Sequence, residues 1–328
     1  MAGAITEFDL IARIRARAGT RDDVSQGIGD DAAILRLPMG SDLIVSTDTL
    51  NSGVHFPHET KPSDVGWKAL AVNLSDLAAM AAKPAWCTLN LTIPCADGDW
   101  LDEFLNGFLA LAAQCDVALV GGDTTRGPLS VTVTALGYVP RDAAMRRSGA
   151  QVGDDVWVSG TLGDAAAALR QWRDGSIADG SLRERLDRPT PRTGLGMFLR
   201  GIANACIDIS DGLLADIDHI LDASRVGAEI EIASLPTSSE LENAVDAATR
   251  IRLQLGGGDD YELCFTAPPM LAHNVLRAAR QSRVAVTRIG RIDRTPGLRL
   301  RDAAGIVSEA PRSGYRHFDE SSERTGPA

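Results

Sequence analysis

Residues 63–82 read SDVGWKALAVNLSDLAAMAA, a stretch that is apolar over nearly its whole length. Its leucine and alanine content predicts a long helix, with Ser63 as the N-terminal cap and Asp64 in the first turn. One carboxylate, Asp76, interrupts the apolar run. An ionised carboxylate among apolar neighbours must be solvated, paired or bound to a cation. We favour pairing or cation binding for Asp76, because alanine and leucine are its neighbours, and keep a solvent-facing position as the alternative.

Five further segments place aspartate where an apolar run meets small residues. They are GIGDD (27–31), STDT (46–49), GGDT (121–124), DISDG (208–212) and GGDD (257–260). Each is explained on its own by turn or cap chemistry, but turns do not account well for such recurrence. Two carboxylates about 4 Å apart repel by roughly 4 kcal/mol at an effective dielectric of 20. Converging aspartates therefore predict bound Mg²⁺, and Mg²⁺ beside glycine-rich turns predicts phosphate chemistry.

The position of each aspartate refines this expectation. Asp48 and Asp123 are predicted to follow short buried strands, where α/β proteins place ligand groups. Asp208 and Asp211 share a face if their segment is helical, although a helix cap also explains Asp211. In the doublets Asp30-Asp31 and Asp259-Asp260, an extended backbone would turn one side chain of each pair inward and the other outward.

Composition limits the classes of function. The chain has 328 residues, is 44% hydrophobic and carries a formal net charge of -11. This length allows two domains with their own cores, and the acidic balance argues against a nucleic-acid partner. Five cysteines without a Cys-x-x-Cys pair predict reduced thiols and a cytoplasmic location, with neither a signal peptide nor a membrane span. The three lysines do not follow glycine, which excludes a Walker A loop.

The order of predicted elements indicates a mixed α/β (α+β) fold with two domains. We expect a first domain over residues 1–148 and a second over 149–318, followed by a flexible tail at 319–328. The boundary lies near a polar break. After it, residues 156–159, 160–163 and 164–172 predict a strand, a glycine turn and a helix, which is the usual entry to an α/β unit.

The motifs, taken in order, also resemble a known family. They are GIGDDAA (27–33), STDTL (46–50), GVHF (53–56), KALAVNLSDLAAM (68–80), GGDTTRGPLSVTVTALG (121–137), RSGAQVGD (147–154), SGTLGDAA (159–166), IDISDGL (207–213) and GGGDDYELCFT (256–266). Together they resemble the thiamine-monophosphate kinases, within the aminoimidazole ribonucleotide synthetase superfamily. The chain departs from the family at Ala81, where glycine is usual, and at Asp259, where glutamate is common.

The resemblance implies a site, position by position. The implied magnesium ligands are Asp30, Ser46, Thr47, Asp48, Asp76, Asp123, Asp208 and Asp211. The implied ATP contacts are Gly122, Asp123, Arg147 and Ser210. The implied contacts to thiamine monophosphate are His55, Glu262 and Phe318. No residue is implied as a general base.

The resemblance further implies a homodimer, in which the sheet of the N-terminal domain forms a barrel across the two copies, and a sandwich-like C-terminal α/β domain. The implied reaction is in-line transfer from ATP to thiamine monophosphate, giving thiamine diphosphate and ADP, assisted by several Mg²⁺ ions. A monovalent cation requirement stays open. The alternatives are another ATP-dependent enzyme of the superfamily, or a non-catalytic magnesium- or nucleotide-binding protein.

Overall fold

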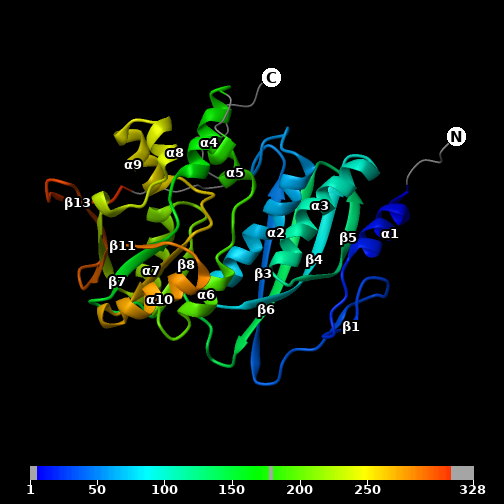
Figure 1. Cartoon of the computed structure of the whole chain (residues 1–328), viewed down its shortest axis with the longest axis horizontal. Helices are drawn as coiled ribbons and strands as arrows, with labels where there is room; N and C mark the ends of the chain where they lie inside the picture. The colour runs from blue at the N-terminus through cyan, green and yellow to red at the C-terminus, as the bar shows by residue number, and fades with distance from the viewer. Residues whose placement is uncertain (1–5, 177–179, 312–328) are drawn as a thin grey trace.

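The computed structural model describes residues 6–176 and 180–311. The N-terminal half contains helices α1 (Glu7–Arg17), α2 (Pro62–Ala79) and α3 (Gly98–Gln114) and strands β1 (Val24–Gln26), β2 (Ile34–Leu35), β3 (Ser41–Asn51), β4 (Lys83–Ile93), β5 (Ala118–Arg126) and β6 (Ser130–Pro140). Strands β3 to β6 form a sheet in the order β3-β6-β4-β5, in which only β4 and β5 run parallel. Helices α2 and α3 lie together against this sheet (Figure 1).

The C-terminal half builds a second sheet. Its strands are β7 (Asp155–Ser159), β8 (Ala205–Asp208), β9 (Gly227–Glu231), β10 (Leu263–Ala267), β11 (Val286–Asp293), β12 (Gly297–Arg301) and β13 (Val307–Glu309). Its helices are α4 (Asp164–Arg173), α5 (Gly180–Asp187), α6 (Thr193–Leu199), α7 (Leu213–Ser224), α8 (Ser239–Ala244), α9 (Ala247–Gly256) and α10 (Ala272–Ser282), with 3-10 turns η1 (Ile232–Ser234) and η2 (Pro269–Leu271). The strand order is β13-β12-β9-β11-β7-β10-β8, which leaves β8 at an edge.

Helix α2 connects the two halves. Its leucines pack into the first core, with α3 and the sheet. Its C-terminal alanines join a core that contains residues of α6, α10 and β10. Gly196 in α6 approaches the Ala78 carbonyl so closely that a Cβ at Gly196 would lie 2.1 Å from that oxygen. A helix that is apolar on all sides is buried on all sides, which explains the composition of residues 63–82.

The structure corrects several expectations drawn from the sequence. Helix α2 begins at Pro62 with Lys61 as the N-cap, so Ser63 is not the cap, whereas Asp64 does lie in the first turn. Strand β3 continues through Asp48, and β5 continues through Asp123. These two aspartates therefore lie within strands and not after them. No helix within the described residues has the length and apolar character needed to cross a membrane.

Candidate active site

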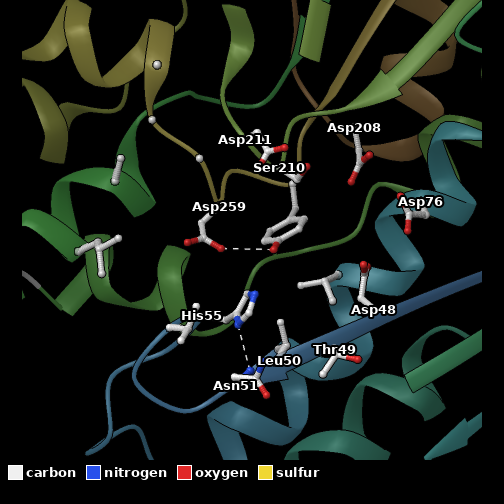
Figure 2. Close-up of a pocket in the computed structure, with 18 of the residues that line it drawn as sticks. Asp48, Thr49, Leu50, Asn51, His55, Asp76, Asp208, Ser210, Asp211 and Asp259 are labelled. Atoms are coloured by element: carbon white, nitrogen blue, oxygen red, sulfur yellow. Dashed lines mark hydrogen bonds between the residues drawn. The ribbon is translucent and has the colours of Figure 1, made fainter. Parts of the chain in front are cut away.

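A cavity of about 1140 Å³ lies where β3, α2, the end of β8 and the loop after α9 meet. Edge strands β3 and β8 contribute to it from the two sheets. Figure 2 shows Asp48, Asp76 and Asp208 along one side of this cavity, with Asp211 and Ser210 beside them and His55 and Asp259 on the other side. Side chains from both halves of the chain therefore share one cavity.

Two of the acidic side chains come from β3 and α2. Asn73, buried in α2, accepts a hydrogen bond through Oδ1 from the backbone N–H of Asp48 at 3.0 Å. The Ser46 hydroxyl donates to Asp76 Oδ2. Alternation along a strand puts Ser46 and Asp48 on the same side of β3, which here is the side that faces α2. The two contacts fix β3 against α2 and bring the carboxylates of Asp48 and Asp76 together.

The C-terminal half supplies the other acidic groups. Asp208, 5% exposed, is the last residue of β8. The loop that follows it, Ser210 to Gly212, is held by Asp216 in α7. The Asp216 carboxylate accepts backbone hydrogen bonds from all three loop residues at 3.0–3.1 Å. This anchor places Ser210 and Asp211 at the cavity.

Burial and mutual repulsion make these carboxylates hard to ionise. Burial, then the nearby charges of Asp76 and Asp211, raise the pKa of Asp48 to about 6. Burial and the charge of Asp76 also raise the pKa of Asp208 well above its ordinary value. Burial raises the pKa of Asp76 as well, while the Ser46 hydroxyl and the charge of Arg147 act in the opposite direction. A cluster of this kind favours cations.

The opposite side of the cavity contains fewer carboxylates. The turn after β3 brings Val54 and His55 to the cavity, where Tyr261 also lies. His55 Nδ1 accepts a hydrogen bond from the Asn51 N–H at 3.0 Å, as drawn in Figure 2. Asp259 lines the cavity, and Asp260 is buried and accepts hydrogen bonds from the Gly163 N–H. The backbone at Asp259 is left-handed, with φ of +67°, and not extended as the prediction assumed, and Asp30 and Asp31 are both exposed.

Known proteins match almost the whole chain. Models of the AIR synthase related protein match residues 29–139 with the N-terminal domain and residues 151–303 with the C-terminal domain. Thiamine-monophosphate kinase of Salmonella typhimurium is 45% identical over 324 residues, which are 96% of this chain and 99% of the relative. A crystal structure of thiamine-monophosphate kinase from Stenotrophomonas maltophilia K279a is 54% identical, covers 91% of this chain and 97% of its own, and has a TM-score of 0.85.

The chain belongs to the thiamine-monophosphate kinase family. Another solved structure, AaThiL complexed with AMPPCP and TMP, is 32% identical, covers 95% of this chain and 96% of its own, and has a TM-score of 0.75. The two matched domain models also establish that this family member is a two-domain α/β protein.

The structure places some of the magnesium ligands implied by the family resemblance at the cavity and others away from it. Ser46, Asp48, Asp76, Asp208 and Asp211 line the cavity. Thr47 also borders it, but its hydroxyl points across the other face of the sheet to Thr134 Oγ1, at 2.9 Å. In the described residues, no group of three or more acidic, histidine or cysteine side chains is arranged so that it could hold a metal ion.

Two of the implied magnesium ligands, Asp30 and Asp123, do not line the cavity of a single chain. Asp30 is exposed, and its Oδ1 accepts a hydrogen bond from the Asp31 N–H. Asp123 is exposed on β5, at the opposite edge of the sheet from β3. With two strands between them and a strand spacing of about 4.8 Å, the two edges are roughly 14 Å apart. Of the implied ATP contacts, Arg147 and Ser210 line the cavity, whereas Gly122 and Asp123 do not.

The implied contacts to thiamine monophosphate differ in placement. His55 lines the cavity, and Phe318 lies outside the described residues. Glu262 is fully buried, paired with the Arg185 and Arg192 guanidinium groups and bonded to the Ser159 hydroxyl. The nearby guanidinium groups outweigh burial and hold the pKa of Glu262 below its ordinary value. Glu262 does not line the cavity, and a substrate contact by this residue stays a prediction.

The sequence did not indicate three residues that shape this site. Asn73 fixes β3, Asp216 fixes the loop at 210–212, and Lys68 is a fully buried cation beside the cavity. The available signal was a polar residue within an apolar helical run, the same signal that drew attention to Asp76. A lysine in such a run is ordinarily explained by its aliphatic stem, with the ammonium in water.

Proposed function

We propose that this chain transfers the γ-phosphoryl group of ATP to the phosphate of thiamine monophosphate, producing thiamine diphosphate and ADP. The observation that carries the proposal is the convergence of Asp48, Asp76 and Asp208, from distant parts of the sequence, on one cavity in a member of this kinase family. The volume of about 1140 Å³ exceeds the range of roughly 300–1,000 Å³ typical for one small ligand, which suits two substrates held together.

The acceptor needs no strong general base. A phosphate monoester has a second pKa near 6, so at neutral pH it is already largely a nucleophilic dianion. The difficulty of the reaction lies in bringing two anions into line. Transfer is therefore direct, without a phosphoenzyme, and the residues at the cavity orient the substrates and offset their charge.

Magnesium fits the acidic side of the cavity. Mg²⁺ usually binds through one or two carboxylates together with waters and substrate phosphates, so three closely arranged side-chain ligands are unnecessary. Asp48 and Asp76 are the best-placed holders, with Asp208 and Asp211 beside them. Several such ions would neutralise phosphate charge and align donor and acceptor. Arg147 lies near this side, because it lines a smaller pocket together with Asp76 and Asp208, and it is suited to a phosphate of ATP.

The other side of the cavity suits the thiamine rings. Val54, His55 and Tyr261 offer apolar and aromatic surface there, and Asp259 adds a carboxylate. A thiazolium ring is cationic, and aromatic faces and carboxylates attract cations. We assign the acceptor to this side and the ATP phosphates to the side of Arg147 and Ser210.

The homodimer is part of the proposal. The face of the N-terminal sheet opposite α2 carries Leu43 (48% exposed), Val45 (54% exposed) and the hydrogen-bonded pairs Thr47–Thr134 and Thr49–Thr132. No described helix covers these side chains, so a second copy closing a barrel over this face is consistent with them. The cysteine composition supports a cytoplasmic location.

A product assay tests the function. The chain is incubated with ATP, MgCl₂ and one acceptor at a time: thiamine monophosphate, thiamine, or another phosphate monoester. We expect equimolar thiamine diphosphate and ADP with thiamine monophosphate alone, and loss of both when a chelator removes the metal. ATP hydrolysis without diphosphate formation would favour another enzyme of the superfamily, and binding of ATP without turnover would favour a non-catalytic protein.

A further inference from the structure

Lys68 is a fully buried cation that the proposed mechanism does not use. It lies in the middle of α2 and is 1% exposed. Its ammonium contacts Asp259 Oδ1 at 3.0 Å and donates to the His55 carbonyl oxygen at 3.1 Å. Lysine is almost never fully buried unless it is paired, and here both of these partners belong to segments that line the cavity.

The two contacts join segments that are far apart in the sequence. His55 belongs to the turn over residues 51–56, where the Val54 and His55 N–H groups donate to the Asn51 carbonyl. Asp259 belongs to the loop over residues 256–261, after α9. That loop is bonded in turn to the strand-end segment, through Asp259 N–H to Ser210 O at 2.9 Å and Tyr261 N–H to Ile209 O at 2.8 Å. One ammonium therefore connects α2 with a cavity wall from each half of the chain.

The loop at 256–261 has a backbone that needs such support. Asp259 has φ of +67° and Tyr261 has φ of +49°. Left-handed conformations cost non-glycine residues roughly 1–2 kcal/mol each, and they persist where the surroundings determine them. The Asp259 carboxylate, held by Lys68 and by the Tyr261 hydroxyl at 3.3 Å, supplies part of that support.

We propose that Lys68 is a positioning residue that holds the turn at 51–56 and the loop at 256–261 in the spacing that the acceptor substrate requires. The inference rests on the proposed function, which places thiamine monophosphate between these segments. Lys68 does not line the cavity, so we expect no contact between its ammonium and the reacting phosphates. Its loss therefore weakens acceptor binding, and it leaves the binding of ATP, on the Arg147 side of the cavity, unchanged.

A purely structural ion pair is the competing explanation. Buried ion pairs often add little net stability, because desolvation offsets the attraction, but removing one partner leaves an uncompensated charge. Asp259→Asn strands the buried ammonium, so it should destabilise the fold more than Lys68→Met, which leaves the part-exposed Asp259 carboxylate. The double variant should recover that stability. A structural pair would change stability in this way without a selective change in KM.

The test compares Lys68→Met, Asp259→Asn and the double variant with the wild type. Asparagine tolerates positive φ well, so Asp259→Asn removes the charge and keeps the backbone. Lys61→Met, at an exposed lysine of the α2 N-cap, is the matched control. Steady-state kinetics gives KM for each substrate, and hydrogen–deuterium exchange reports on residues 51–56 and 256–261.

We expect KM for thiamine monophosphate to rise about tenfold in Lys68→Met with KM for ATP and kcat nearly unchanged, the pattern of lost uniform binding. The double variant should be no worse than the worse single variant, and exchange should rise in both segments. Lys61→Met should resemble the wild type. Equal KM changes for both substrates, or no change for the acceptor, overturn the proposal.

The exchange measurement keeps the two proposals separable. If the wild type makes no thiamine diphosphate, the proposed function fails by that result alone. Unchanged exchange at residues 51–56 and 256–261 in Lys68→Met overturns the positioning role whatever the wild type phosphorylates.

Discussion

Asp48 illustrates how the fold forces charge into a place where charge is costly. The Asn73 side chain fixes its backbone, and burial with the charges of Asp76 and Asp211 raises its pKa to about 6. The unfolded chain ionises this group near 3.8. The folded protein therefore retains a proton between these two values, and the contribution of Asp48 to stability falls as pH rises from about 4 to about 6. A bound cation reverses this effect, because it favours the ionised carboxylate.

The direction of this pH dependence gives a prediction for Mg²⁺ binding. Mg²⁺ should raise the melting temperature more at about pH 7.5 than at about pH 5, because binding at the lower pH must first displace protons from the carboxylates. Differential scanning fluorimetry at both pH values, with and without MgCl₂, measures the difference. An equal shift at both pH values, or a full shift in Asp48→Asn, would contradict the role given to this side chain.

At the scale of elements, the packing of α2 on α3 depends on glycine. A Cβ at Gly107 would lie 1.7 Å from the Ser63 carbonyl oxygen, and one at Gly66 would lie 2.2 Å from that of Phe104. These two positions let the helix backbones approach directly. Because α2 carries Asn73 and Asp76, a displacement of this helix also displaces the acidic side of the cavity.

Gly107→Ala should therefore lower the free energy of unfolding by about 1–3 kcal/mol, the usual cost of overpacking. Gly19→Ala is the control, because Gly19 is exposed and a Cβ there meets nothing within 4 Å. Equilibrium denaturation in urea compares the two variants. Equal unfolding free energies for Gly107→Ala and the wild type would show that α2 and α3 can move apart without loss of stability, which would contradict this account.

The helices and strands also show which features the sequence pattern predicts and which it does not. The apolar character of residues 63–82 was enough to predict a long helix and to single out Asp76. The ends of β3 and β5 were placed too early because threonine and glycine continue these strands where apolar alternation stops. Lys68 was missed because its pairing with Asp259 depends on a contact across 191 positions of sequence, which no local pattern contains.

At the scale of the whole molecule, one chain gathers part of the implied site. Asp48, Asp76, Asp208 and Asp211 converge, whereas Asp30 and Asp123 stay on exposed segments. Recurrence in the sequence predicted that all of these aspartates converge, but it contained no information on which of them one copy could bring together. The sheet order, which separates β3 from β5, decides that.

The dimer prediction belongs to this scale. Light scattering coupled to size-exclusion chromatography should give the wild type twice the chain mass of 34.7 kDa. Leu43→Arg, on the uncovered face of the sheet, should shift it toward a single chain, because a buried unpaired charge is costly. A wild type with the mass of one chain, or a variant that stays dimeric, would refute the barrel across two copies.

Turnover by Asp48→Asn is the measurement that decides whether the gathered carboxylates drive phosphoryl transfer. Asparagine keeps the size of the side chain and removes its charge, so circular dichroism should show an intact fold. We predict that kcat for thiamine diphosphate formation at saturating substrates and MgCl₂ falls by about 10³-fold or more, since charge neutralisation by the held metal is the main catalytic contribution. A folded Asp48→Asn variant that turns over at nearly the wild-type rate would contradict it.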